Sequence, residues 1–181
     1  METEGTLSPE SLDEAREAFE AAGPTAQQVV REAAKAMEFD REEYRERVTS
    51  EVVERARNVV FADRLAVTVG TRAEFESWVD EHPDYDVTTL GSPDVDRIAW
   101  HAAPFAEAAV AASFQNEREA AVGTLRRQAF GHLYRPRFES ETDGADDATG
   151  AIEQGEFGSG GDEQDGFGDG SDDETEDSSG A

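Results

Sequence analysis

The sequence predicts an α+β body followed by a disordered acidic tail. Apolar residues recur every three or four positions over roughly the first 60 residues, and they alternate with polar residues in two later segments. Apolar residues then become scarce after residue 138. We therefore expect a globular body over residues 1–138 and a tail over residues 139–181, with about three N-terminal helices packed against a small, mainly antiparallel sheet and a C-terminal helix.

The N-terminal part carries helix start and stop signals. Ser8-Pro9 is typical of a helix start, and Gly23-Pro24 predicts the end of that first helix. A second helix is expected from Thr25. Its expected buried stripe consists of Ala26, Val29, Val30, Ala33 and Met37.

A third helix is expected from Asp40, where Glu43 completes a capping box, to about Phe61. Thr49 and Ser50 allow a break within it. Its expected apolar stripe consists of Tyr44, Val48, Val52, Ala56 and Val59.

The period then changes to that of a sheet. Leu65–Val69, Tyr85–Leu90 and Val95–Ala102 are predicted strands, and a short capped helix follows Gly70-Thr71. The alanine-rich segment 106–114 fits either a strand or a helix, and we favour a strand pairing with the preceding one. A final helix is expected from Asn116 to Pro136.

The charge is strongly acidic, with 43 acidic and 16 basic residues and a net charge of −27. The tail holds 16 of the acids and no base, and Lys35 is the only lysine. Such a chain repels itself at low salt, whereas at 1 M salt the Debye length falls to about 3 Å. The composition therefore predicts adaptation to a cytosol rich in potassium chloride.

Several classes of protein are not indicated. The chain has no cysteine, and its three histidines are too far apart in sequence for a metal-ligand motif. No phosphate-binding or dinucleotide-binding fingerprint is present, so no cofactor or metal is expected. The N-terminus does not resemble a signal peptide, and no apolar run approaches the roughly 20 residues of a membrane span. We expect a soluble cytoplasmic protein without a membrane partner.

Residues 26–48 are similar to a helix-turn-helix segment. Arg41, Arg45 and Arg47 would then face DNA, but the acidic residues among them oppose contact with a polyanion. A plain helical hairpin is the alternative interpretation.

A basic cluster near the end of the body is a second candidate site. It consists of Arg126, Arg127, Arg135 and Arg137, with His132 between them. These cations would stabilise the end of a helix through its dipole, or they would bind an anion, a partner or the acidic tail.

His101 is the candidate for acid–base chemistry, because Asp96 and Glu107 lie near it in sequence. The alternation of the strand places it on the face opposite Trp100, and a structural histidine is the alternative interpretation.

The tail offers two weaker features. Phe157 and Phe167 are spaced aromatic residues that are either a docking motif or incidental. The calcium-like run 160–169 fails as a binding loop, since Phe167 stands where a polar ligand is required.

Four segments resemble an uncharacterised haloarchaeal protein family over about residues 1–138. They are Met1–Glu10, Ala34–Val48, Val69–Glu76 and Ala99–Ala106. The resemblance implies a salt-adapted cytoplasmic protein and no known activity.

The absence of a catalytic constellation favours a non-catalytic protein-interaction or regulatory module. A DNA-binding regulator using residues 26–48 and a small enzyme using His101 are the alternatives. The partner and the oligomeric state are left open by the sequence.

Overall fold

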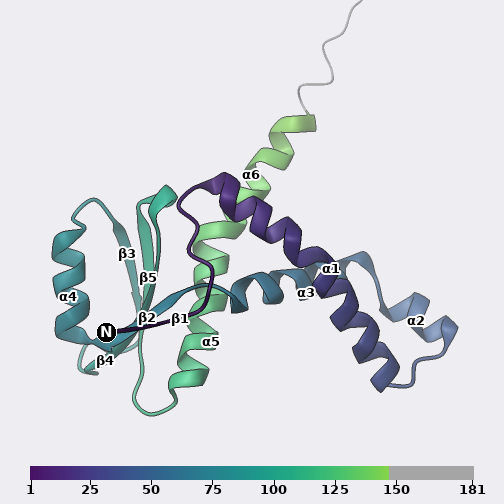
Figure 1. The fold of residues 1–181 in the computed structure, drawn as a ribbon, viewed down its shortest axis with the longest axis horizontal. Helices are drawn as coiled ribbons and strands as arrows, with labels where there is room; N and C mark the ends of the chain where they lie inside the picture. Colours follow the sequence, from purple (N-terminus) through teal and green to yellow (C-terminus); the bar gives the residue numbers. More distant parts are fainter. Residues whose placement is uncertain (147–181) are drawn as a thin grey trace, which may run out of the picture.

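The computed structural model describes residues 1–146, which form an α+β body around a five-stranded sheet (Figure 1). The strands are β1 (Glu2–Glu4), β2 (Val67–Thr71), β3 (Asp86–Leu90), β4 (Arg97–Ala103) and β5 (Ala108–Ser113). They lie in the order β1-β2-β4-β5-β3, and only the β3–β5 pair is parallel. The predicted α+β class and mainly antiparallel sheet are confirmed, and the segment 106–114 contributes a strand.

Helices surround the sheet and extend beyond it. They are α1 (Leu12–Ala36), α2 (Arg41–Arg47), α3 (Ser50–Asp63), α4 (Arg72–Glu81), α5 (Arg118–Ala129) and α6 (Arg135–Asp146). A π-helical turn, Phe130–Tyr134, joins α5 to α6. Helix α6 therefore continues past the expected boundary at residue 138. The rest of the expected tail, including Phe157 and Phe167, lies outside the described residues.

The two faces of the sheet have separate cores. On one face, α4 places Phe75 against Ile98 and Trp100. On the other face lies the larger core, in which α5, the π turn and the near ends of α1 and α3 cover the sheet. Alternation along β4 places Trp100 in the smaller core and His101 in the larger one, as the period of a strand requires.

The prediction that Gly23-Pro24 ends the first helix is wrong, because α1 runs unbroken from Leu12 to Ala36. Its N-cap is Ser11, whose hydroxyl accepts the Glu14 N–H, rather than Ser8. Pro24 lacks the N–H that would bond to the Glu20 carbonyl, and both residues are exposed. Arg57 of α3 donates to the neighbouring Phe19 carbonyl at 2.7 Å, which supports the helix where proline weakens it.

The prediction that Pro136 ends the last helix is also wrong. The Arg135 N–H bonds to the Phe130 carbonyl, five residues back, so the backbone widens into a π turn just before the proline. Pro136 follows directly, so its missing N–H falls where the π turn has already interrupted the regular ladder of hydrogen bonds.

A helical arm projects from the body (Figure 1). We define the arm as residues 24–59, which comprise the second half of α1, all of α2 and most of α3. The allowed break at Thr49 is confirmed, since its hydroxyl caps α3 by accepting the Val52 N–H. The arm lies away from the sheet, with α2 at its far end.

The turn at Gly5 admits only glycine, and this generates a testable prediction. Gly5 has φ +105°, and an added Cβ would lie 2.4 Å from the Leu65 carbonyl oxygen. We expect Gly5→Ala to lower the free energy of unfolding by about 1–3 kcal/mol in urea denaturation. Gly131→Ala is the control, because its Cβ would meet nothing within 4 Å and alanine is the better helix former. Equal stability of the two variants would contradict the prediction.

Candidate interaction surface

The arm is held together by antiparallel pairing of α1 with α3. Near the body, the Phe19 and Phe61 rings meet edge-to-face with centroids 5.5 Å apart, and Arg57 lies over the Phe19 ring at 4.0 Å. Farther out, Gln27 of α1 lies beside Ser50 of α3. Residue numbers thus rise along one helix as they fall along the other, which places Val52 at the level of residues 25–28, within about one helical turn of Val29.

The arm contains three pairs of consecutive valines, Val29-Val30, Val52-Val53 and Val59-Val60, which we call valine doublets. They make the apolar stripe of each helix wider than the pairing of α1 with α3 can bury. In each doublet the second valine, Val30, Val53 or Val60, faces inward and is buried or half-buried. The first valine is exposed: Val29 by 51%, Val52 by 38% and Val59 by 58%. The prediction that these first valines are buried is therefore wrong, because two paired helices cover only one stripe on each. Met37 and Tyr44, also expected in the buried stripes, are exposed as well.

The exposed valines of both helices lie on one side of the arm. Each of them precedes its buried neighbour by one residue, a step of about 100° around the helix. In an antiparallel pair, positions displaced in the same direction from the contact line fall on the same face. We call this surface the arm face. It consists of Val29, Ala33 and Ala36 of α1 and Val52, Ala56 and Val59 of α3.

Helix α2 covers the opposite side. Tyr44 lies with Gln27 and Arg31 around a shallow hollow of about 230 Å³. Gln27 and Val29 are two residues apart, so they point about 200° away from each other around α1. The arm face is therefore left open by the described part of the chain.

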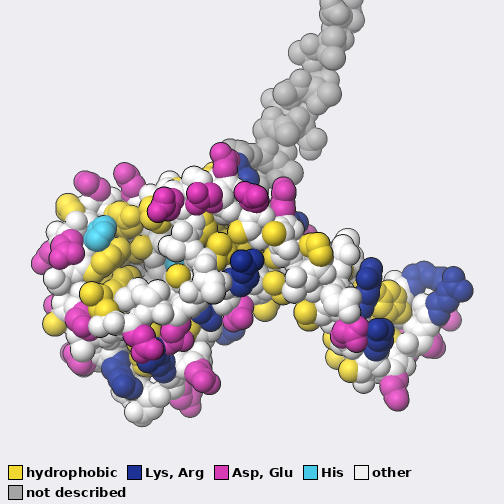
Figure 2. Space-filling view, viewed as in Figure 1, with side chains coloured by type: hydrophobic (Ala, Val, Ile, Leu, Met, Phe, Trp, Pro, Cys, Tyr) yellow, Lys and Arg dark blue, Asp and Glu magenta, His cyan; other side chains and the backbone are white. Residues whose placement is uncertain are grey.

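Charge is distributed unevenly between the arm and the rest of the body. The arm holds seven basic and eight acidic residues, whereas the rest of residues 1–138 holds nine basic and nineteen acidic ones. The space-filling view shows hydrophobic surface on the arm beside Lys and Arg side chains near its end (Figure 2). All six positions of the arm face are uncharged. An arm of net charge −1 with one uncharged apolar face differs from the acidic surface expected of a chain of net charge −27.

The structure places Arg41, Arg45 and Arg47 on α2 or at its end, all exposed. Arg47 lies over the Phe39 ring at 5.1 Å and forms a long ion pair with Glu43 at 3.8 Å. Helix α2 has only seven residues, and three of them are acidic. This geometry gives little support to a recognition helix, which must bring cations close to phosphates.

The structure disperses the expected basic cluster along α5 and α6. Arg126 is mostly buried and donates to the Leu65 carbonyl at 2.9 Å, which joins α5 to the start of β2. Arg127 bonds to the Thr124 hydroxyl, and Arg137 to the Leu133 carbonyl. Arg135 pairs with Glu139 at 2.8 Å. Arg126 thus has its partner in the loop between α3 and β2, whereas the other three arginines have partners three or four residues away in the chain.

His101 lies in the larger core and is 1% exposed. Its Nδ1 lies 2.6 Å from the Ala66 carbonyl, which only accepts, so Nδ1 carries the proton. Its Nε2 then accepts from the Tyr134 hydroxyl at 2.8 Å. Asp96 and Glu107 are both exposed at the ends of the neighbouring loops. These contacts give His101 a structural role joining β4 to the π turn, and they offer no support for an acid–base site.

The surroundings of His101 hold it neutral. Burial lowers the pKa of His101, the hydrogen bond to Ala66 opposes that shift in part, and the nearby positive charge of Arg126 lowers the pKa further. Burial also raises the pKa of Tyr134 far above its usual range, so its hydroxyl remains a donor.

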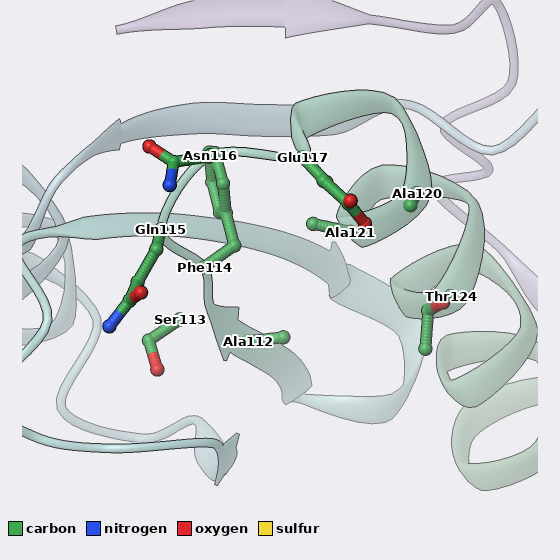
Figure 3. Close-up of a pocket in the computed structure, with 9 residues that line it drawn as sticks. All are labelled: Ala112, Ser113, Phe114, Gln115, Asn116, Glu117, Ala120, Ala121 and Thr124. Carbon is green, nitrogen blue, oxygen red and sulfur yellow. The ribbon is translucent and has the colours of Figure 1, made fainter.

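A groove of about 490 Å³ lies between the end of β5 and the first turns of α5 (Figure 3). Its polar lining includes Ser113, Gln115, Asn116 and Thr124, and Glu117 is the only charged residue in the lining. A lone carboxylate without a base or nucleophile beside it does not form a catalytic constellation.

Residues 1–146 offer neither a cluster of metal-ligating side chains nor a membrane-spanning helix. No group of three or more metal-ligating side chains comes close enough together there to hold an ion. No helix of that part is long and apolar enough to cross a membrane.

The fold and surface together define an α+β protein with a projecting helical arm. Residues 6–135 match the model of a family of unknown function, DUF5809, and the chain belongs to that family. No curated protein and no solved structure matches the chain.

The buried His101 predicts a dependence of stability on pH. The folded state holds the pKa below the ordinary value near 6.5, so below pH 6.5 the unfolded chain binds a proton that the folded chain does not. The stabilisation is complete above pH 6.5 and is lost as the pH falls below it. We expect urea denaturation to show a loss of about 1 kcal/mol between pH 7.5 and 5.5.

His101→Gln should flatten this pH dependence, whereas His132→Gln, at an exposed position, should leave it unchanged. A slope that persists undiminished in His101→Gln would show that another group causes it.

Proposed function

We propose that the protein is a non-catalytic interaction module that binds another folded protein through the arm face. The observation that carries this proposal is the exposure of Val29, Val52 and Val59 on one uncharged side of a projecting helical pair. Burying such side chains is worth roughly 25 cal/mol for each Å² removed from water. A partner that covers them removes this apolar area from water without approaching the acidic body.

The hydrogen bonding of the buried polar groups in the body also supports this proposal. Within the described residues, every fully buried side-chain nitrogen or oxygen has a hydrogen-bond partner. The groups that chemistry would use, chiefly His101 and Tyr134, are engaged with each other and with the backbone. An interaction module needs no free buried acid or base, whereas an enzyme usually does.

The composition supports a second proposal, that the protein works in a salt-rich cytoplasm. Fifteen of the sixteen basic residues are arginine, and acids exceed bases by 27. Screening at molar salt removes the self-repulsion of such a chain.

The interaction proposal is tested by a pull-down in molar potassium chloride from an extract of the source cells. The baits are the full chain, Val29→Glu and the matched control Gln27→Glu, which adds the same charge to the opposite side of α1. We expect the full chain and the control to retain one identified partner that Val29→Glu loses. The interaction is then repeated with that partner purified. Three baits that retain the same proteins, or none, would overturn the proposal.

The salt proposal predicts that the melting temperature rises with potassium chloride concentration. We expect an increase of several degrees between about 0.1 M and about 1 M, the range over which the Debye length shrinks from about 10 Å to about 3 Å. Circular dichroism melting curves measure it. A melting temperature that is flat or falls over this range would argue for an ordinary acidic protein.

A further inference from the structure

We propose that the outer edge of β3 binds an extended basic peptide, which adds a further strand to the sheet. This inference goes beyond the proposed function, because it concerns a second surface that lies on the body and not on the arm. Three features carry it: backbone groups of β3 that have no partner, the lack of the residues that usually block an edge strand, and the charge and aromatic rings beside the edge.

The pairing of β3 with β5 shows which way the backbone of β3 faces. Strand β3 is the last strand of the sheet and lies parallel to β5, with Asp86 opposite Ala108. The Asp86 N–H donates to the Glu107 carbonyl at 2.8 Å, so the backbone groups of Asp86 face β5.

Alternate residues of β3 therefore face away from the sheet. The backbone groups of successive residues in a strand point to opposite sides, so Thr88 and Leu90 also face β5, whereas Val87 and Thr89 face outward. Within residues 1–146 no other strand pairs with this outer side. The N–H and C=O groups of Val87 and Thr89 are thus available to a strand from another chain.

The opposite edge of the sheet is protected, whereas β3 is not. Strand β1 has only three residues, and its Glu2 and Glu4 form ion pairs with Arg118. Strand β3 has five residues, Asp-Val-Thr-Thr-Leu, with one charge at its start and no lysine, proline or glycine. Proteins commonly block an edge with charged residues or proline, or keep it short. Valine and threonine instead favour strand pairing.

The charge beside the edge selects a basic partner. Four exposed acidic residues and no basic residue lie in positions 80–86: Asp80, Glu81, Asp84 and Asp86. None of the four forms an ion pair with another described residue. A strand that carries arginine or lysine is attracted to these carboxylates, whereas a second copy of the same acidic edge is repelled by them.

Aromatic rings at the start of β3 suit the same partner. Tyr85 directly precedes β3, and its ring meets the Trp78 ring edge-to-face with centroids 5.5 Å apart. Both side chains are half-buried, so each presents part of its ring to solvent. Arginine binds favourably over the faces of such rings. The carboxylates and the rings therefore favour a cationic side chain beside the free backbone groups.

Hydrogen exchange of the full chain, followed by nuclear magnetic resonance, tests the inference. The probe is a short capped peptide in which arginine and valine alternate, at about 0.1 M potassium chloride, where screening is modest. At about ten times the Kd of the peptide, exchange of the Val87 and Thr89 amides should slow about tenfold, because only about one edge in ten is then free. The Thr88 and Leu90 amides, which face β5, should change less.

Two outcomes of this experiment overturn the inference. One is exchange at Val87 and Thr89 that the peptide does not slow at any concentration up to millimolar. The other is protection of these amides in the chain alone that increases with protein concentration, because a second copy would then occupy the edge.

Two control peptides separate strand pairing from attraction by charge alone. One has every backbone nitrogen methylated, which keeps the charges and removes the N–H donors. The other has glutamate in place of arginine. We expect neither to slow exchange at Val87 and Thr89. A methylated peptide that binds as tightly as the unmodified one would show attraction without strand pairing and would overturn the inference.

Variants of the chain complete the test. Thr89→Pro removes an outward N–H and no bond to β5, so it should abolish most peptide binding. Asp84→Lys, at an exposed position before β3, should weaken binding several-fold, whereas Glu46→Lys makes the same charge change on α2 and should not. Unchanged binding in both Thr89→Pro and Asp84→Lys would contradict the inference. Val29→Glu should bind the peptide as the unaltered chain does, so failure of the arm proposal is read separately.

Discussion

The length of α1 is the constraint on which the rest of the structure depends. Its 25 residues extend about 37 Å, whereas the seven-residue strand β4 spans about 23 Å. The near end of α1 therefore packs on the body through Ala15 and Phe19, and the far end has no sheet to cover. That far end packs chiefly against α3, with Tyr44 of α2 beside it. Two helices bury one stripe on each partner, so any second apolar stripe is left on the surface.

In the body, by contrast, side chains from several elements pack together in one core. Tyr134 contacts His101, Phe61 and Phe105, so one side chain of the π turn connects β4, α3 and the turn before β5. The extra residue of the π turn sets the direction of this tyrosine, and the neutral histidine provides the acceptor that its buried hydroxyl requires. A buried pair of this kind makes the core specific, and it leaves neither His101 nor Tyr134 free to react. Exposed valines are instead found on the arm, at Val29, Val52 and Val59.

The sequence predicted correctly those features that depend only on neighbouring residues, such as helix caps and the alternation of side chains along a strand. The capping boxes of Asp40 with Glu43 and of Thr71 with Glu74 are present as expected, and alternation around Trp100 placed His101 on the opposite face. The two helix ends predicted at Pro24 and Pro136 are wrong. Each proline is accommodated by a feature that the local sequence does not reveal, Arg57 of α3 for Pro24 and a π turn for Pro136. The valine doublets were visible as apolar periodicity. Which valine of each doublet would face α3 depends on the pairing of helices, which periodicity alone does not determine.

The acidity of the chain affects how an exposed apolar surface such as the arm face can associate. An exposed apolar face on a weakly charged protein promotes indiscriminate association. On a chain of net charge −27, an approach by another acidic protein through the rest of the body, which holds nineteen acidic and nine basic residues, is opposed by like-charge repulsion. Under the proposed function, charge would restrict association with acidic proteins to the arm, where acids and bases are nearly balanced. At molar salt this restriction weakens beyond a few ångströms, while apolar contacts persist. Specificity in concentrated salt must then come from the fit of the valines and the small residues beside them, and not from long-range charge.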